Sequence, residues 1–387
     1  MPWRGELGAM SEAVTAEPRR ERLASLDALR GFDMFWIMGA DAIGGVAASM
    51  TEGKQGWARI VAEHLEHVPW EGFRFYDLIF PLFVFIAGVS LVFSLEKTVA
   101  RHGRAWAFGR LLLRATALYV LGVLYYGGVA EGWDQVRWMG VLQRIAISYL
   151  GAGLCYLLFG LRGCVGAWVA LLVGYWAAMT FVPVPGVGAG NFEEGKNLAN
   201  WIDSRWLPGR KWDGDHDPEG LLSNLPAIGT CLMGVLAGGW MRRPPEGRGL
   251  GKASGLVVAG VVLLGLGWGW AWQFPVIKKL WTSSYVLVAG GWSCLLLAAF
   301  HGVVDVRGWA GWCRPFTWVG LNPIAVYLSA QLVSYDSLAR RLVGGPVQAM
   351  LEGWMPHLGE LGVAGVGIGL GFVLAWGLNR QRIYLRL

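Results

Sequence analysis

The chain has 387 residues, of which 55% are apolar and only 16% are charged, and its formal net charge is +6. Ordinary soluble domains carry about 25% charged residues, so this composition excludes a soluble architecture and predicts an integral membrane protein surrounded by lipids. The basic residues fall in short clusters between apolar runs, as they do where they set membrane topology, so the positive charge does not indicate a nucleic-acid partner.

Residues 1–24 are polar and charged and lack the apolar core of a signal peptide. We expect them to form a cytoplasmic tail, followed by a single transmembrane domain over 25–387.

The apolar runs predict an all-α, polytopic bundle of about ten transmembrane helices, since each crossing needs about 20 mainly apolar residues. The expected helices are 29–50, 75–95, 106–127, 139–159, 163–182, 224–241, 250–272, 283–303, 314–335 and 360–380. With the N-terminus in the cytoplasm, the cytoplasmic segments hold most of the Lys and Arg residues, as the positive-inside rule requires. An even number of helices then makes both termini cytoplasmic.

This topology places His67 and the long loop 183–223 outside the membrane. His67 precedes the apolar run Leu78–Phe93, and a group that titrates near neutral pH at a membrane face is a candidate for chemistry. The alternative is a solvated loop histidine, for which His64 is an equal candidate. Long loops are usually functional or disordered, and the aromatic and acidic residues of 183–223 are typical of a folded cap that contacts a sugar.

Ionisable groups inside a membrane are costly, and each is a candidate functional residue. Asp41, Asp77 and Arg144 share the expected depth of His67. The alternative is a structural ion pair of Arg144 with one of the two aspartates. The other polar candidates within expected helices are Asp33, Arg114, His301, Gln143, Asn322 and Gln331.

Two short motifs have both a structural and a functional interpretation. In Leu26–Gly31, the structural interpretation is that Asp27 caps a helix and Arg30 lies among lipid headgroups. The functional interpretation is that Arg30 binds the phosphates of a cytosolic cofactor. In the outer loop before the eighth helix, Lys278 and Trp281 either anchor the chain in the interface or bind an anion or a sugar.

No histidine spacing resembles a zinc site, so we expect no metal. The five cysteines lie in or beside apolar runs and predict no disulfide framework. The Gly365-x-x-x-Gly369 and Gly367-x-x-x-Gly371 spacings allow close helix packing, either within the bundle or in a homodimer.

Several stretches together resemble one family. They are Arg22–Gly31, His67–Gly72 followed by Asp77–Gly88, Gly140–Ile145, Asp217–Leu222, Lys278–Tyr285 and Asn322–Ile324. Each is weak alone, but the ordered set is similar to the heparan-α-glucosaminide N-acetyltransferase family of transmembrane enzymes and spans about residues 20–385.

This resemblance implies transfer of an acetyl group from cytosolic acetyl-CoA to the amino group of a glucosamine-type sugar across the membrane. It also implies that His67, rather than His64, is the catalytic histidine. The lysosomal enzyme has asparagine at the position of Asp41, where an amide would stabilise an oxyanion but a carboxylate could orient His67. The position of Ile277 usually holds a more polar residue in relatives, so the substrate contacts of that loop differ from the family pattern. Without a large lumenal N-terminal domain, the expected acceptor is a small amino sugar or an envelope glycan, and the expected location is a bacterial inner membrane.

The resulting hypothesis makes His67 a general base or an acetyl carrier, with Asp41 or Asp77 holding its tautomer. Arg144, Asn322, Arg30 and Arg114 are the expected cofactor contacts, and Lys278, Trp281, Asp217, Glu219 and Trp70 the expected acceptor contacts. Two rivals remain open. Polytopic bundles with buried charges also transport sugars, so an amino-sugar transporter is one, and an O-acyltransferase of an envelope polysaccharide is the other.

Overall fold

The computed structural model describes residues 23–50, 56–243 and 250–385, and over these ranges the chain is helical without a β-strand. The expected all-α class is therefore confirmed. Residues 1–22 of the expected tail lie outside the described part. The elements are α2 (Ala24–Ser49), α3 (Trp57–His64), α4 (Phe75–Tyr125), α5 (Val141–Phe181), α6 (Leu198–Trp206), α7 (Asn224–Met241), α8 (Leu250–Trp270), α9 (Ser283–Phe300), α10 (Arg314–Leu321), α11 (Pro323–Leu332), α12 (Tyr335–Val343), α13 (Pro346–Trp354) and α14 (Leu358–Arg380).

Six helices in the described ranges are long and apolar enough to cross a membrane: α4, α5, α7, α8, α9 with its π-helical extension to Val306, and α14. The expected number of about ten is not confirmed. Two of the six are each broken by a glycine, Gly103 in α4 at φ 83° and Gly160 in α5 at φ 64°. Positive φ favours glycine, which has no Cβ to clash. These breaks fall where the sequence predicts that one helix ends and the next begins.

The expected helix 314–335 is divided into α10 and α11 at Asn322, which has φ −133° and ψ 45°. Pro323 explains the break, because a proline disfavours the helical conformation of the residue before it and is well tolerated at the first position of the next helix. The predicted single span is therefore wrong in this detail.

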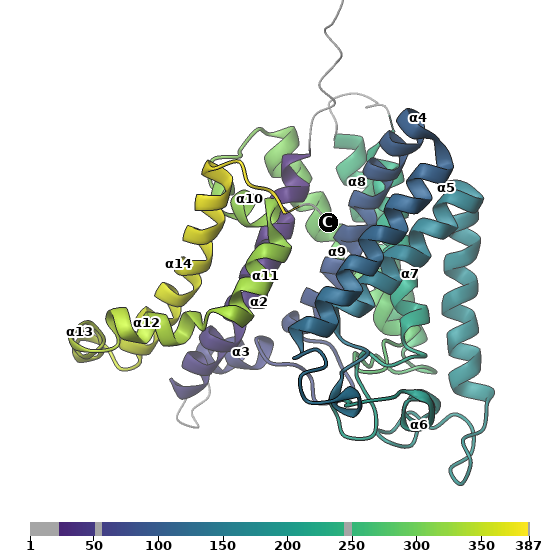
Figure 1. Ribbon diagram of the computed structural model, residues 1–387, viewed down its shortest axis with the longest axis horizontal. Helices are drawn as coiled ribbons and strands as arrows, with labels where there is room; N and C mark the ends of the chain where they lie inside the picture. The colour runs from purple at the N-terminus through teal and green to yellow at the C-terminus, as the bar shows by residue number, and fades with distance from the viewer. Residues whose placement is uncertain (1–22, 51–55, 244–249, 386–387) are drawn as a thin grey trace, which may run out of the picture.

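The helices form two groups in Figure 1. In one group α4, α5, α7, α8 and α9 pack against one another, and in the other α2 packs against α10 and α14. Glycines allow close approach inside both groups: a side chain at Gly88 of α4 would collide with the backbone of Cys231 in α7, and one at Gly320 of α10 with the backbone of Asp27 in α2. Such contacts are typical of membrane helix pairs.

The two glycine pairs of α14 lie in different surroundings. Gly367 and Gly371 pack on α12 and α2, whereas Gly365 and Gly369 face open space. The first pair therefore packs helices within the bundle, and the homodimer stays a prediction.

Loop 183–223 is folded, since it contains α6 and covers one end of the molecule, the same end at which α3 lies (Figure 1). Leu198, Ala199 and Leu280 share a buried apolar cluster there. This cluster joins the cap to the loop before α9, so both loops are positioned beside the segment that carries His67.

Candidate active site

His67 lies in the turn between α3 and α4, and its Nδ1 is 2.9 Å from Oδ1 of Asp77. Asp77 is in the first turn of α4 and is fully buried, and its Oδ2 accepts hydrogen bonds from the backbone N–H groups of Arg74 and Val68. Asp77 thus satisfies unpaired N–H groups at the helix start while it holds the imidazole. The His67 side chain is 48% exposed, so a ligand can reach the ring.

The network indicates a tautomer of His67 that suits a base. A carboxylate only accepts hydrogen bonds, so Nδ1 carries a proton toward Asp77 and Nε2 is the acceptor nitrogen of the ring. This is the same arrangement by which a carboxylate orients a histidine base in hydrolytic triads. The sequence-based pairing of His67 with a nearby aspartate is therefore consistent with the geometry around Asp77.

Lys278 joins this pair from a distant part of the chain. Its Nζ is 2.8 Å from Nδ1 and 2.9 Å from Nε2 of His67 and 3.7 Å from Oδ1 of Asp77. Its loop is held in place by a hydrogen bond from Gly72 N–H to Val276 O. Burial lowers the pKa of Lys278 to about 8, although the charge of Asp77 acts in the opposite direction. The sequence predicts that Lys278 contacts the acceptor sugar, but its contact with His67 is evident only in the structure.

Asp41 reaches the site through a residue that the sequence analysis misses. The Tyr76 ring stacks on the imidazole of His67, with centroids 4.4 Å apart and planes 9° apart, and the Tyr76 hydroxyl interacts electrostatically with the Asp41 carboxylate. The exposed Asp41 therefore acts on Tyr76, while Asp77 contacts His67 itself. In the sequence, the only feature that pointed to Tyr76 as a site residue was its position directly before Asp77.

Arg144 is buried in the first turn of α5. One of its terminal nitrogens donates to Ser223 Oγ, and its guanidinium lies 4.6 Å from the centre of the Trp281 ring. Its Nε and its other terminal nitrogen have no partner among the described residues. Buried polar groups are nearly always paired, so these two nitrogens are candidate donors to an oxygen acceptor of a ligand, such as a carbonyl.

The sequence left open an ion pair of Arg144 with Asp41 or Asp77. In the structure, the carboxylate charges that interact most strongly with the Arg144 guanidinium are instead those of Glu219 and Asp217 in the cap. Both carboxylates bind Arg137, at 2.8 and 2.9 Å for Asp217 and 2.6 Å for Glu219. Asp217 also accepts from the backbone N–H of Trp212. Burial raises the pKa of Glu219.

Asp217 and Glu219 were both expected to contact the acceptor. The oxygens of Asp217 are occupied by the protein, so its observed contacts hold the cap together, and a substrate contact by either residue stays a prediction. Arg137 was missed by the sequence analysis, although it stands just before the motif Gly140–Ile145.

The two expected tryptophans differ in their surroundings. Trp281 is buried and donates from Nε1 to Thr230 Oγ1 at 3.0 Å, so it packs behind Arg144. Trp70 donates from Nε1 to Phe192 O at 3.0 Å, which ties the His67 turn to the cap.

Three expected cofactor contacts lie apart from this group. Arg30 donates to Gly320 O at 3.0 Å and Ser90 Oγ at 2.6 Å, between α2, α10 and α4. Asn322 bonds Ile383 O and Leu385 N–H near the C-terminus. Arg114 donates to the hydroxyl of Tyr149 at 3.3 Å.

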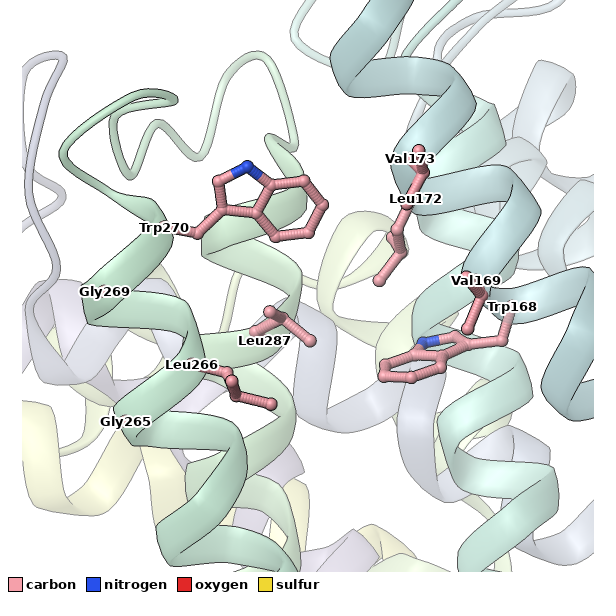
Figure 2. Close-up of a pocket in the computed structure, with 9 residues that line it drawn as sticks. All are labelled: Trp168, Val169, Leu172, Val173, Gly265, Leu266, Gly269, Trp270 and Leu287. Atoms are coloured by element: carbon pink, nitrogen blue, oxygen red, sulfur yellow. The ribbon is translucent and has the colours of Figure 1, made fainter.

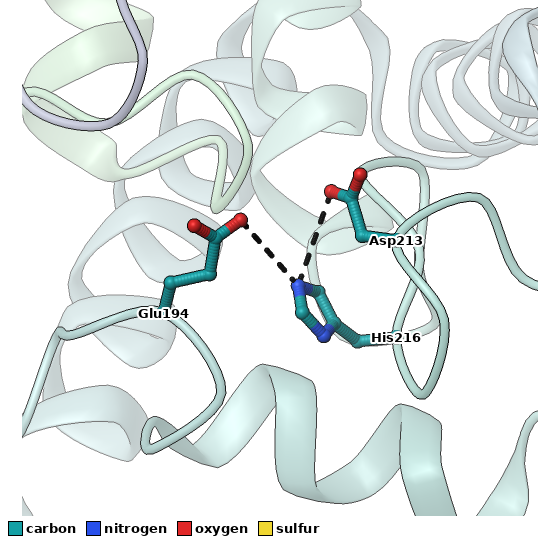
Figure 3. Close-up of side chains that lie close together, drawn as sticks. All are labelled: Glu194, Asp213 and His216. Carbon is teal, nitrogen blue, oxygen red and sulfur yellow. Dashed lines mark ion pairs between the residues drawn. The ribbon is translucent and has the colours of Figure 1, made fainter.

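Glu194, Asp213 and His216 come close enough together to resemble a metal site, with ligand atoms within 4.8 Å of one another (Figure 3). Lys279 Nζ lies 2.7 Å from Glu194 and 2.9 Å from Asp213. Burial lowers the pKa of Lys279, but the hydrogen bonds to these two carboxylates outweigh it, so the pKa is raised. Lys279 thus offsets part of the negative charge of this cluster and joins the cap to the loop of Lys278.

An apolar groove of about 420 Å³ lies between α5 on one side and α8 and α9 on the other, with Trp168, Leu172, Leu266 and Trp270 in its walls (Figure 2). Its lining carries no ionisable group, and it does not contain His67. The groove is therefore suited to hydrocarbon, and the chemistry belongs to the site around His67.

No protein-family model matches the chain. The chain is similar to heparan-alpha-glucosaminide N-acetyltransferase of Homo sapiens, with 26% identity over 443 aligned residues that cover 100% of this chain and 63% of the relative. It is also similar to the protein of the same name from Mus musculus, with 28% identity over 327 residues, covering 70% of this chain and 49% of the relative. The expected resemblance is confirmed, and the chain spans about half to two thirds of the length of these relatives.

Proposed function

We propose that this chain is a transmembrane N-acetyltransferase that moves the acetyl group of cytosolic acetyl-CoA to the amino group of a glucosamine-type sugar outside the cytoplasm. The single observation that carries this proposal is the Asp77–His67–Lys278 group, in which a half-exposed imidazole contacts both a carboxylate and an ammonium. The similarity to proteins named N-acetyltransferases supports it. We further propose about ten membrane crossings, two cytoplasmic termini and a bacterial inner membrane as the location.

His67 would act on the acceptor amine. Its Nε2 takes a proton from the amine, and the nitrogen lone pair attacks the thioester carbonyl. The carbon–sulfur bond then breaks, and the imidazolium returns the proton to the leaving thiolate, so the products are an amide and free CoA. In the alternative route Nε2 attacks the thioester first, the carbon–sulfur bond breaks and CoA leaves as the thiolate. The amine then displaces the imidazole from the acetyl group, and the proton that the amine loses goes to the thiolate, so the products are again an amide and free CoA. Asp77 supports both routes, because it stabilises the charge on the imidazole.

Lys278 and Arg144 would handle the developing negative charge. An ammonium 2.9 Å from Nε2 is near the position where the tetrahedral oxygen forms, and preorganised donors at that position are a major source of catalysis. The unpaired N–H groups of Arg144 fit the carbonyl oxygen of an acetyl thioester. Asn322, Arg30 and Arg114 are proposed as contacts of the CoA portion, and Trp70, Trp281, Asp217 and Glu219 as parts of the acceptor side.

The test uses purified protein, acetyl-CoA labelled in the acetyl group, and glucosamine. A general base typically contributes about 10²–10⁴-fold in rate, so His67→Ala should lose at least about 10²-fold of the transfer while its thermal unfolding is unchanged. The matched control is His64→Ala, which removes the neighbouring histidine and should retain activity. Near-normal transfer by His67→Ala contradicts the assignment.

The same assay separates the rival functions. A base-stable product is an amide, whereas a base-labile ester on an added polysaccharide would identify an O-acyltransferase. Uptake of labelled glucosamine into proteoliposomes without acetylation would identify a transporter.

A further inference from the structure

The cap holds a group of ionisable side chains that the proposed reaction does not use. His216, in the loop that follows α6, directs its ring toward Glu194 and Asp213 (Figure 3). Its Nε2 lies 3.8 Å from Oε1 of Glu194 and 3.9 Å from Oδ2 of Asp213. The two carboxylates come from opposite sides of α6 in the sequence, so the folding of the cap brings them together rather than a local motif.

The ring of His216 is buried with one nitrogen unsatisfied. Only 7% of the side chain is exposed, and Nε2 has no hydrogen-bond partner among the described residues. Both carboxylate oxygens are too far from Nε2 for a hydrogen bond, so a proton on this nitrogen would not satisfy it. Buried polar atoms nearly always have a partner, and an atom that binds Nε2 and both acids at once must be a cation.

The other nitrogen of the same ring is held as it is in metal sites. Nδ1 of His216 lies 2.6 Å from Oδ1 of Asp215, and a carboxylate only accepts hydrogen bonds, so Nδ1 carries the proton. The lone pair is then on Nε2, the nitrogen that faces the two acids. Histidines that bind metals usually donate their second N–H to a carboxylate in this way, which fixes the tautomer and the ring orientation.

Lys279 places a positive charge at this point but satisfies only two of the three groups. Its Nζ lies 2.7 Å from Oε1 of Glu194 and 2.9 Å from Oδ2 of Asp213, the same two oxygens that His216 faces. Lys279 is 32% exposed and lies 6.0 Å from the centre of the Trp70 ring, so its ammonium has another favourable position near an aromatic face. A metal ion can therefore replace it.

The ligand set indicates which ion fits. One imidazole nitrogen with two carboxylate oxygens suits Zn²⁺, whereas Ca²⁺ and Mg²⁺ prefer oxygen ligands alone. The ligand atoms lie within 4.8 Å of one another, and around a tetrahedral Zn²⁺ they would be about 3.3 Å apart. Around His216 this requires a contraction of about 0.5 Å, which Glu194 can supply because it is 44% exposed. A water molecule would take the fourth position.

We infer that Glu194, Asp213 and His216 form a Zn²⁺ site in the cap, at which the ion competes with Lys279. The inference goes beyond the proposed function and does not depend on it, because it concerns binding alone. It departs from the sequence-based expectation of no metal, which rested on the spacing of histidines. When the ion is bound, Lys279 loses both carboxylate partners, so Zn²⁺ replaces one link between the cap and the loop before α9 with a link inside the cap.

The first test measures Zn²⁺ binding by the purified full-length chain, without a histidine tag, against a chromophoric chelator in detergent. His216→Gln should lose one equivalent of tightly bound Zn²⁺. Asp215→Asn should weaken binding by about 10- to 100-fold, as is usual when the partner of a metal-binding histidine is removed. The control is His64→Gln, which removes an exposed histidine and should bind like the wild type. Unchanged Zn²⁺ binding by His216→Gln overturns the inference.

The second test asks for tighter binding, which a misfolded variant cannot produce. Lys279→Met should bind Zn²⁺ at least about 10-fold more tightly, because it removes a positive charge adjacent to two of the ligands. The control is Lys196→Met, whose lysine pairs with Glu193 on the same cap and should leave the affinity unchanged. If Lys279→Met binds Zn²⁺ no more tightly than the wild type, the ion does not compete with Lys279 and the inference fails. Displacement of Zn²⁺ from the wild type by an equal concentration of Ca²⁺ would show a site made of oxygens alone and would also refute it.

Discussion

At the scale of single residues, the imidazole of His67 contacts two groups of opposite charge. Asp77 Oδ1 lies 2.9 Å from Nδ1, and Lys278 Nζ lies 2.8 Å from Nδ1 and 2.9 Å from Nε2. Asp77 orients the ring through Nδ1, while Lys278 places a positive charge beside it. Each partner therefore has a separate and testable effect.

Asp77→Asn should lower kcat by about 10²–10⁴-fold, the range for loss of a working general base. The amide can still accept from the backbone of Arg74, but it no longer offers a negative charge to Nδ1, and it favours the wrong tautomer. The measurement is kcat with saturating acetyl-CoA and glucosamine, with circular dichroism to show retained helix. A fully active Asp77→Asn would leave Asp77 with a capping role alone.

The pH dependence of kcat should show the charge on Lys278. Its pKa is about 8, so the ammonium is present below this pH and is lost as the pH rises through it, and kcat should fall over the same interval. In Lys278→Arg the side chain stays charged throughout, so this decline should disappear even where the absolute rate is lower. Using one acceptor for both proteins cancels the titration of its own amine. Identical declining limbs in the two proteins would exclude Lys278 as the titrating group.

At the scale of elements, the cap is held to the bundle by ion pairs rather than by apolar contacts alone. Arg137, in the segment that precedes α5, binds Asp217 and Glu219 of the cap. Lys279, in the loop that precedes α9, binds Glu194 and Asp213 of the cap. These links bring three loops to one place, and they set the distance between Lys278 and the rest of the site.

Arg137→Met should destabilise the protein, because it leaves two largely buried carboxylates without their cation. Breaking a buried pair in this way typically costs about 3–5 kcal/mol, which should appear as a clear fall in the thermal unfolding midpoint in detergent. Arg205→Met, on the exposed side of α6, is the control and should stay within about 0.5 kcal/mol of wild type. Equal midpoints for the two variants would mean that the Arg137 pairs do not stabilise the cap.

At the scale of the whole molecule, the cap with α6 and the turn within α4 lie at opposite ends of the helices (Figure 1). The turn within α4 falls at Gly103. The proposed reaction needs these ends in different compartments, because acetyl-CoA is cytosolic and the acceptor is not. We propose the orientation that the distribution of Lys and Arg favours, in which the cap lies outside the cytoplasm.

A cysteine-labelling experiment tests this orientation. Trp206 on the cap is 71% exposed, and His102 beside the Gly103 turn is also exposed, whereas four of the five native cysteines are buried. A membrane-impermeant maleimide added to intact spheroplasts should label Trp206→Cys and not His102→Cys, and both should react after lysis. The reverse pattern would place His67 in the cytoplasm.

Local features of the sequence determined the class of the protein and part of its site. Hydropathy determined the all-helical membrane architecture, since the bilayer requires apolar, internally hydrogen-bonded segments. The sequence indicated His67 as a residue at a membrane face and Asp77 as one of two aspartates that could hold it, and the structure brings these two into contact across ten positions.

Only the tertiary structure decided the partners that come from distant segments. Lys278 meets His67 across 211 positions and Arg144 meets Ser223 across 79, and neither hydropathy nor spacing carries that information. The same packing assigned Asp217 to Arg137 and directed Asn322 to the C-terminal segment. The physical reason is that apolar patterning specifies which surfaces are buried, whereas the pairing of the few buried charges depends on which helices and loops meet.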